Sequence, residues 1–131
     1  MVSRERPKHP REYPVYRPRW DERPEELLGC SFQTEEELDW VRIAKKGAKV
    51  VAAYQVAKID TFNFSILSLA VSPHYRGQGI GHWMLLHALG LIESKGGRTV
   101  HVNWGYTVPL LERLGFGHDQ EKHHWLHLER E

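Results

Sequence analysis

One stretch, residues 69–81, constrains this chain more than any other part of its sequence. It reads LAVSPHYRGQGIG, so an apolar strand is followed by a turn with three glycines, and a long apolar helix begins directly afterwards. The first turn of a helix carries backbone N–H groups without intrahelical partners at its positive end, and these groups bind phosphates. Glycine also lets the backbone approach a ligand closely. The stretch therefore predicts a phosphate-binding turn.

Two common phosphate-binding motifs do not match this turn. Its glycines lie at 77, 79 and 81, which is not the G-x-G-x-x-G spacing of dinucleotide-binding proteins, and no G-K-S/T sequence of a nucleotide-triphosphate loop follows. The turn instead resembles the acyl-CoA-binding signature R/Q-x-x-G-x-G/A of the GCN5-related N-acetyltransferase (GNAT) family, which residues 76–81 match as RGQGIG. A glycine-rich turn without a ligand is the alternative interpretation.

Further segments support the resemblance, which covers residues 40–129. Residues 69–73 resemble the fourth strand of the GNAT family, and the LGF sequence at 114–116 resembles the end of its last helix. The resemblance implies an α/β acyl-CoA N-acyltransferase fold, with a mixed central sheet splayed at the CoA site and a reduced N-terminal helical region. It also implies acetyl-CoA as cosubstrate and these CoA-binding residues: Leu69, Ala70, Val71, Arg76, Gly77, Gln78, Gly79, Ile80, Gly81 and His82.

The catalytic half of the family pattern is absent. Where many members carry a carboxylate on the fourth strand, this chain has Ser65, and where many carry a tyrosine in the last helix, it has Leu111. Trp104 stands at the position of a frequent asparagine. Two substitutes are candidates: His101, whose imidazole titrates near neutral pH and which shares a strand face with Asn103, and Tyr106 in the following loop. The alternatives are a surface histidine and a tyrosine that only packs in its loop.

Composition excludes several classes of protein. The formal net charge of +1 arises from 18 basic and 17 acidic side chains, which argues against nucleic acid or an anionic membrane as a partner. No apolar run has the length of a membrane span, and no signal peptide is evident. We therefore expect a cytoplasmic protein. The single Cys30 is expected to be a small core residue.

The first 20 residues differ from the rest of the chain. Arginines alternate there with prolines, which disfavours helix and favours extended chain. We expect residues 1–20 to form a Pro/Arg-rich extension and residues 21–131 to form one domain. Residues 13–20 are apolar enough to add a short edge strand. The extension is either a basic arm for a phosphate or an acidic partner, or a solvated extension without a function of its own.

The order of elements expected from residue 21 on is two short helical pieces, three strands, a long helix, a strand, a short helix and two strands. Pro24 opens the first helical piece, and Thr34 with Glu37 reads as a capping box for the second. Apolar patterning and turn residues predict the later strands over 40–59, with a turn at 45–47, and over 63–71, 99–103, 116–120 and 123–129, and the helices over 80–95 and from Pro109 to Leu114.

The histidines near the C-terminal end do not predict a metal site. His118, His123, His124 and His127 lack the spacing of usual zinc ligands, and consecutive residues of a strand point to opposite faces.

Three functions are consistent with these patterns. The first is an acetyl-CoA-dependent N-acetyltransferase, the second a non-catalytic CoA-binding module, and the third a binding protein that uses its basic arm. The acceptor amine is not identified. A shallow acceptor side would suit a peptide or protein amine, or a site completed by a second subunit in a homodimer.

Overall fold

The computed structural model of the chain describes residues 13–104, 109–119 and 123–128. Its strands are β1 (Val15–Tyr16), β2 (Val41–Lys46), β3 (Lys49–Lys58), β4 (Asn63–Val71), β5 (Thr99–Val102), β6 (Gly117–His118) and β7 (His124–His127). Its α-helices are α1 (Glu25–Leu28), α2 (Ile80–Ser94) and α3 (Pro109–Arg113). Three 3₁₀ turns complete the described elements: η2 (Trp20–Glu22), η3 (Glu35–Trp40) and η4 (Pro73–Tyr75).

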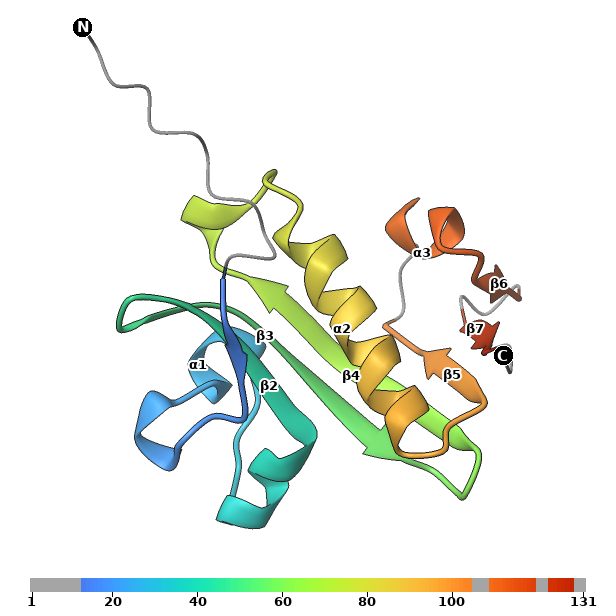
Figure 1. Cartoon of the computed structure of the whole chain (residues 1–131), viewed down its shortest axis with the longest axis horizontal. Coiled ribbons are helices and arrows are strands. Elements are labelled where there is room, and N and C mark those ends of the chain that lie inside the picture. Colours follow the sequence, from blue (N-terminus) through green and yellow to red (C-terminus); the bar gives the residue numbers. More distant parts are fainter. Residues whose placement is uncertain (1–12, 105–108, 120–122, 129–131) are drawn as a thin grey trace, which may run out of the picture.

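The strands form one mixed sheet in the order β1-β2-β3-β4-β5-β7-β6 (Figure 1). Neighbouring strands are antiparallel except β4 and β5, which are parallel. A parallel pair needs a crossover connection, and α2 supplies it between these two strands. The mixed α/β sheet expected from the sequence is confirmed.

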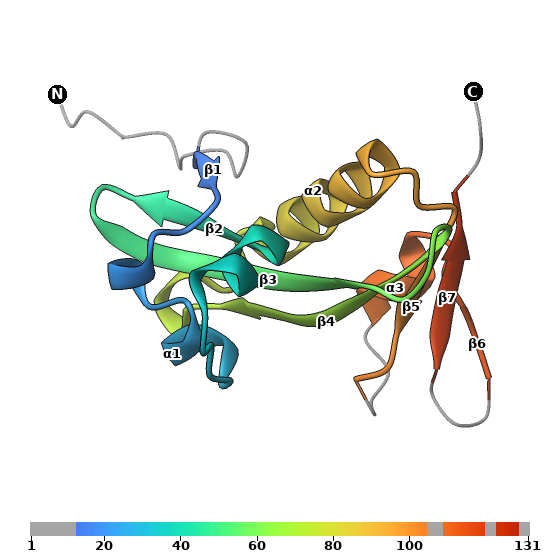
Figure 2. The ribbon, with the colours of Figure 1, turned by 90° about the horizontal axis from the view of Figure 1, so that it is seen from below.

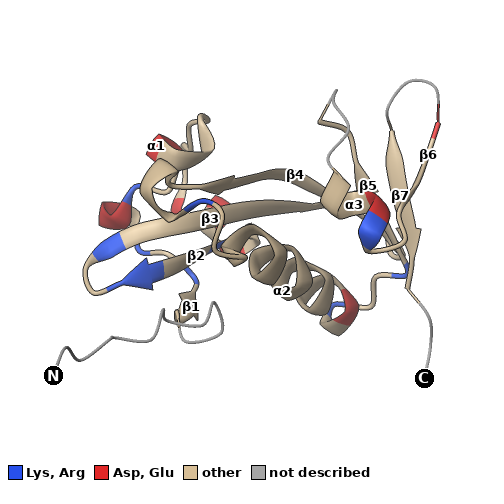
Figure 3. Cartoon of the chain, turned by 90° about the horizontal axis from the view of Figure 1, so that it is seen from above, with Lys and Arg blue, Asp and Glu red and all other residues tan. Residues whose placement is uncertain are grey.

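The long helix α2 covers one face of the sheet, and the short helix α1 lies on the other (Figures 2 and 3). The core lies between the sheet and α2, where the fully buried side chains include Tyr54, Phe64, Ile66, Met84, Leu85 and Ile92. Burial of this apolar surface is the main driving force for folding. The face that carries α1 is also covered in its middle, because Val41, Ile43 and Ala53 of β2 and β3 are fully buried there.

Several elements agree closely with the sequence. The third strand has the expected bounds of Asn63–Val71, and α2 starts at Ile80 and ends one residue early at Ser94. The short edge strand expected within residues 13–20 is β1, which pairs with β2, and Tyr13 beside it is buried. The division into residues 1–20 and 21–131 stays a prediction.

Two expectations are wrong. Cys30 is exposed, because α1 ends at Gly29 in the left-handed conformation (φ +71°) and Cys30 follows it outside any helix or strand. The segment after Thr34 is a 3₁₀ turn without a side-chain cap from Thr34, whereas Glu37 accepts a hydrogen bond from the Gln33 backbone at 3.4 Å.

No helix among the described residues is long and apolar enough to span a membrane.

Candidate active site

The central feature of the site is the separation of β4 from β5. The two strands pair over only three positions, from Asn63 with Thr99 to Ser65 with His101. Beyond them β4 continues to Val71 without a residue of β5 opposite it. The indole Nε1–H of Trp104 donates to the Ile66 carbonyl at 3.0 Å, so a side chain replaces the strand at the point of separation. The splay expected from the sequence is therefore present.

A β-bulge lies at the same point. Gln55 of β3 is opposite Ser68, but the next residue, Val56, is opposite Ile66, so Leu67 is the extra residue of β4. A bulge interrupts pairing and redirects the side chains and peptide groups around it, and bulges are frequent beside active sites. The Leu67 side chain points away from the core and is 48% exposed.

A cavity of about 360 Å³ opens where the two strands separate. It is lined by Leu28 of α1, by residues 67–70 of β4, and by Asn103 and Trp104 after β5. We call it the thioester cavity. None of these lining side chains is charged. The cavity is therefore suited to an uncharged, partly apolar group.

The glycine-rich turn adjoins the end of β4. Gly77 and Gly79 have φ angles of +78° and +85°, which residues other than glycine rarely adopt. The first helical hydrogen bond of α2 runs from the Trp83 N–H to the Gly79 carbonyl at 3.0 Å, so the N–H groups of residues 80–82 precede the helical ladder. A Cβ placed on Gly77 would meet no heavy atom within 4 Å. The turn is thus an open cradle of N–H groups.

Positive charge gathers beside this turn. Arg76 donates from Nε to the Val71 carbonyl at 3.0 Å, which ties the turn to the end of β4. The Nζ atoms of Lys46 and Lys49 lie 5.8 and 5.3 Å from the centre of the Tyr75 ring in η4. The basic tip of the β2–β3 hairpin is visible in Figure 3. Neither lysine was predicted from the sequence as a binding residue. The contact joins segments far apart in the sequence, and no local motif indicates it.

His101 lies in a chain of polar side chains rather than in the cavity lining. Its Nε2 lies 2.9 Å from Oδ1 of Asn63, and its Nδ1 lies 2.9 Å from Nε2 of His123. The Asn63 amide nitrogen donates to both carboxylate oxygens of Asp60, at 2.9 and 3.0 Å. At the other end, Nδ1 of His123 is 3.5 Å from Oδ2 of Asp119. This row of hydrogen-bonded side chains joins three segments of the protein that are far apart in the sequence.

These partners determine the tautomer of His101. The Asn63 amide nitrogen faces a carboxylate, so its oxygen must accept, and Nε2 of His101 must carry the proton. In the neutral ring Nδ1 then accepts from Nε2–H of His123. Burial and the neighbouring His123 lower the pKa of His101 below its usual value. The ring is therefore held neutral at physiological pH.

Three positions that the sequence analysis singled out remain. Tyr106 lies outside the described residues. Ser65 is buried opposite His101, and Leu111 is fully buried in the core. Within the described part of the chain, no group of three or more His, Cys, Asp or Glu side chains is arranged to hold a metal ion.

The comparisons with known proteins agree with this geometry. The model of the acetyltransferase (GNAT) family matches residues 6–116, so the chain belongs to that family. No curated protein matches it as a relative. Among solved structures, the IAA acetyltransferase from Bacillus cereus ATCC 14579 is 23% identical, with a TM-score of 0.69, over 83% of this chain and 79% of that one.

Two further similar structures contain acetyl-CoA. A GNAT family acetyltransferase from Elizabethkingia anophelis is 20% identical, with a TM-score of 0.62, over 74% of this chain and 70% of that one. A GNAT family acetyltransferase from Brucella melitensis is 13% identical, with a TM-score of 0.66, over 92% of this chain and 90% of that one. At these identities the similarity establishes the fold, which is the acyltransferase fold expected from the sequence.

Proposed function

We propose that this protein is an acetyl-CoA-dependent N-acetyltransferase that transfers an acetyl group to a primary amine by direct attack on the thioester. One observation carries the proposal: the open cradle of N–H groups at residues 77–82 lies end to end with the unpaired part of β4. A ligand that fits both features has a phosphate group followed by an extended arm with amide groups. Acetyl-CoA has this form, and it is bound in two of the similar structures.

The residues that would hold acetyl-CoA follow from this arrangement. The N–H groups of residues 77–82 would bind the pyrophosphate, with Arg76 at the start of the turn. The backbone of Leu69, Ala70 and Val71 would pair with the pantetheine amides as an added strand does. Lys46 and Lys49 would add positive charge beside the phosphates. The acetyl group would then lie in the thioester cavity.

The transfer needs an attack and a departure. The amine nitrogen attacks the carbonyl carbon, a tetrahedral oxyanion forms, the C–S bond breaks and the CoA thiolate leaves. A backbone N–H near Val71 would stabilise the oxyanion. A protonated amine cannot attack, because its nitrogen has no free electron pair, and alkyl amines have pKa values near 10. A group at or near the cavity must therefore accept the amine proton.

We propose His101 as the acceptor of that proton and Tyr106 as the donor to the departing thiolate. The cavity itself contains no titratable side chain suited to this role, and Asn103, two residues beyond His101, lines it. Both ring nitrogens of His101 have partners, so one of its hydrogen bonds must open before the ring can receive a proton through water.

The second candidate function is an acyl-CoA-binding module without transfer. It is favoured by Ser65 and Leu111, because neither side chain is a general base or a general acid near neutral pH, and both are buried. Both functions need the same binding site for acetyl-CoA and differ only in the chemistry that follows.

Thiol release distinguishes the two functions. The protein would be mixed with acetyl-CoA and a panel of alkyl, aromatic, polycationic, amino acid and peptide amines. Release of free CoA that depends on the amine is the expected result. Binding of acetyl-CoA with no release for any amine would exclude transfer to these amines and favour the binding module.

We make three further proposals, which concern the location, the domain organisation and the oligomeric state of the protein. We propose a cytoplasmic location, consistent with a single exposed cysteine. We propose that residues 21–131 form the catalytic domain and that residues 1–20 are an extension to it. We also propose that a second copy of the chain can complete the acceptor side, which size-exclusion chromatography with light scattering would test.

A further inference from the structure

A second cavity adjoins the thioester cavity, and Leu67 lines both. It measures about 290 Å³, and we call it the outer cavity. Trp40, Ala57 and Leu67 supply apolar side chains to its lining, and Gln55 supplies an uncharged polar one. Because Leu67 is the bulged residue of β4 and is 48% exposed, its side chain stands between the two cavities. Together they form a groove from the splay of β4 and β5 to η3.

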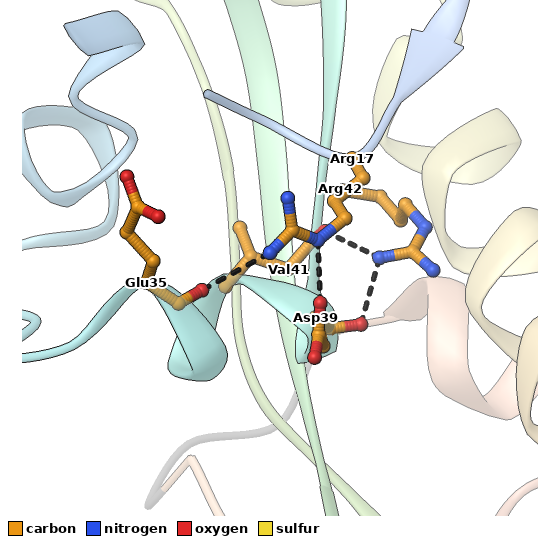
Figure 4. A network of polar contacts seen from close by, with 5 residues as sticks. All are labelled: Arg17, Glu35, Asp39, Val41 and Arg42. Carbon is orange, nitrogen blue, oxygen red and sulfur yellow. Dashed lines mark hydrogen bonds and ion pairs between the residues drawn. The ribbon is translucent and has the colours of Figure 1, made fainter. Parts of the chain in front are cut away.

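The outer wall of this groove is held in a fixed position. Arg17 donates from Nε to Oδ1 of Asp39 and from Nη2 to the Glu35 carbonyl, at 2.5 and 3.1 Å (Figure 4). Arg42 donates from Nη1 to the Asp39 and Val41 carbonyls, at 2.8 and 2.7 Å. These contacts tie η3 to β2 and to the segment after β1. Trp40, at the end of this braced turn, lines the outer cavity, and its ring also packs on Phe64 with a centroid distance of 6.2 Å.

The charges along the groove restrict what can bind in it. The thioester cavity has no charged lining residue, and the outer cavity has one acid, Glu37, and one base, Lys58. Opposite charges in one wall give no net attraction for a polycation or a polyanion. A sugar or another densely polar acceptor would leave polar groups without partners against Trp40 and Leu67. The groove therefore favours the binding of a ligand whose body is apolar.

We infer that the acceptor is a primary monoamine with an extended apolar or aromatic body, whose amine lies in the thioester cavity while its body passes over Leu67 into the outer cavity. The inference rests on the proposed transfer reaction and adds the class of substrate to it. Leu67 is then the residue that determines specificity for the length of the acceptor.

A series of straight-chain amines from propylamine to hexylamine tests this inference. Each buried methylene is worth about 0.8 kcal/mol, so kcat/KM should rise roughly three- to fourfold per methylene in the unmodified protein. Leu67→Asn should reduce the increase per methylene to less than about twofold. The matched control is Leu86→Asn, because Leu86 on α2 is 40% exposed, lines neither cavity and should leave the series unchanged.

Two results would overturn the inference. One is a kcat/KM that does not depend on chain length, or that is higher for spermidine or glutamate than for hexylamine. The other is an equal loss of chain-length dependence in Leu67→Asn and Leu86→Asn.

A binding measurement separates failure of the groove from failure of the proposed function. Calorimetric titration of hexylamine into protein saturated with CoA should show binding that Leu67→Asn weakens at least about threefold. If no amine releases thiol but hexylamine binds in this way, the transfer reaction is wrong and the groove assignment stands. If hexylamine does not bind while other amines are acetylated, the groove assignment is wrong and the transfer reaction stands.

Discussion

The imidazole rings of His101 and His123 meet through Nδ1 and Nε2 at 2.9 Å, and their planes are nearly parallel, with an angle of 11° between them. The contact joins β5 to the residue that precedes β7. Because Asn63 holds the other nitrogen of His101 and Asp119 lies beside the other nitrogen of His123, the pair is the middle of a continuous polar chain. His101 is thus positioned by residues on both sides.

His123→Ala tests the contribution of this contact to stability. The substitution removes the donor to His101 and leaves a half-buried ring nitrogen without that partner, so the free energy of unfolding should fall by about 1 kcal/mol. Urea unfolding followed by fluorescence would measure the change. His74→Ala, at an exposed position in η4, is the control and should change stability by less than about 0.5 kcal/mol. Equal effects of the two substitutions would contradict the assigned contact.

The lowered pKa values of two histidines predict how stability depends on pH. Burial is the main cause for both His87 and His101. Each ring binds a proton less readily in the folded protein than in the unfolded chain, whose histidine pKa is about 6.5. The free energy of unfolding should therefore have its highest contribution from these two histidines above about pH 6.5. It should fall as the pH is lowered toward their pKa values in the folded protein.

Urea unfolding at intervals between pH 7.5 and 5 measures this dependence. His87→Asn and His101→Asn should each make it shallower, because each removes a group that takes up a proton on unfolding. A steeper decline in either variant, or greater stability of the unmodified protein at pH 5 than at pH 7, would contradict the assignment.

Gly79→Glu tests the phosphate-binding turn. The substitution puts a side chain and a negative charge into the phosphate-binding turn at a position with φ +85°, so affinity for acetyl-CoA should fall at least about tenfold, while the fold is retained. Isothermal titration with acetyl-CoA would measure it. Gly90→Glu is the control, because a Cβ there meets no atom within 4 Å and the residue lies within α2, beyond its first turns. Unchanged affinity in Gly79→Glu would refute the location of the site.

Gly97→Ala tests the packing at the start of β5. A Cβ at this position would lie 2.3 Å from Cγ2 of Ile92 and 2.9 Å from a ring carbon of Phe64, both in the core. Overpacking of this kind costs about 1–3 kcal/mol, and we expect a loss of stability in that range in thermal or urea unfolding. A variant as stable as the unmodified protein would show that this part of the core is looser than its geometry indicates.

The local parts of the fold were predictable from the sequence. The bounds of β4 and the start of α2 follow from an apolar run that ends in a turn with glycines at fixed positions, which is a signal contained in neighbouring residues. The exposure of Cys30 was not predictable in this way, because it depends on how the segment after α1 packs in three dimensions. The 3₁₀ form of η3 also depends on its contacts with β2.

The candidate site also combines features that neighbouring residues determine with features that depend on the tertiary structure. The cradle at residues 77–82 is local and was predicted, but the bulge at Leu67 exists only in the pairing of β4 with β3. Lys46 and Lys49 reach the turn only because the β2–β3 hairpin ends beside Tyr75. The roles of His101 and Tyr106 stay predictions.

The most direct test of the proposed function is to measure both products of the transfer in one reaction. Acetyl-CoA and hexylamine would be incubated with the protein, and free CoA and N-hexylacetamide would be quantified by mass spectrometry. Direct transfer predicts equal amounts of the two products, with neither formed above background by Gly79→Glu. Free CoA without the acetamide for every amine tested, or neither product while acetyl-CoA remains bound, would contradict it.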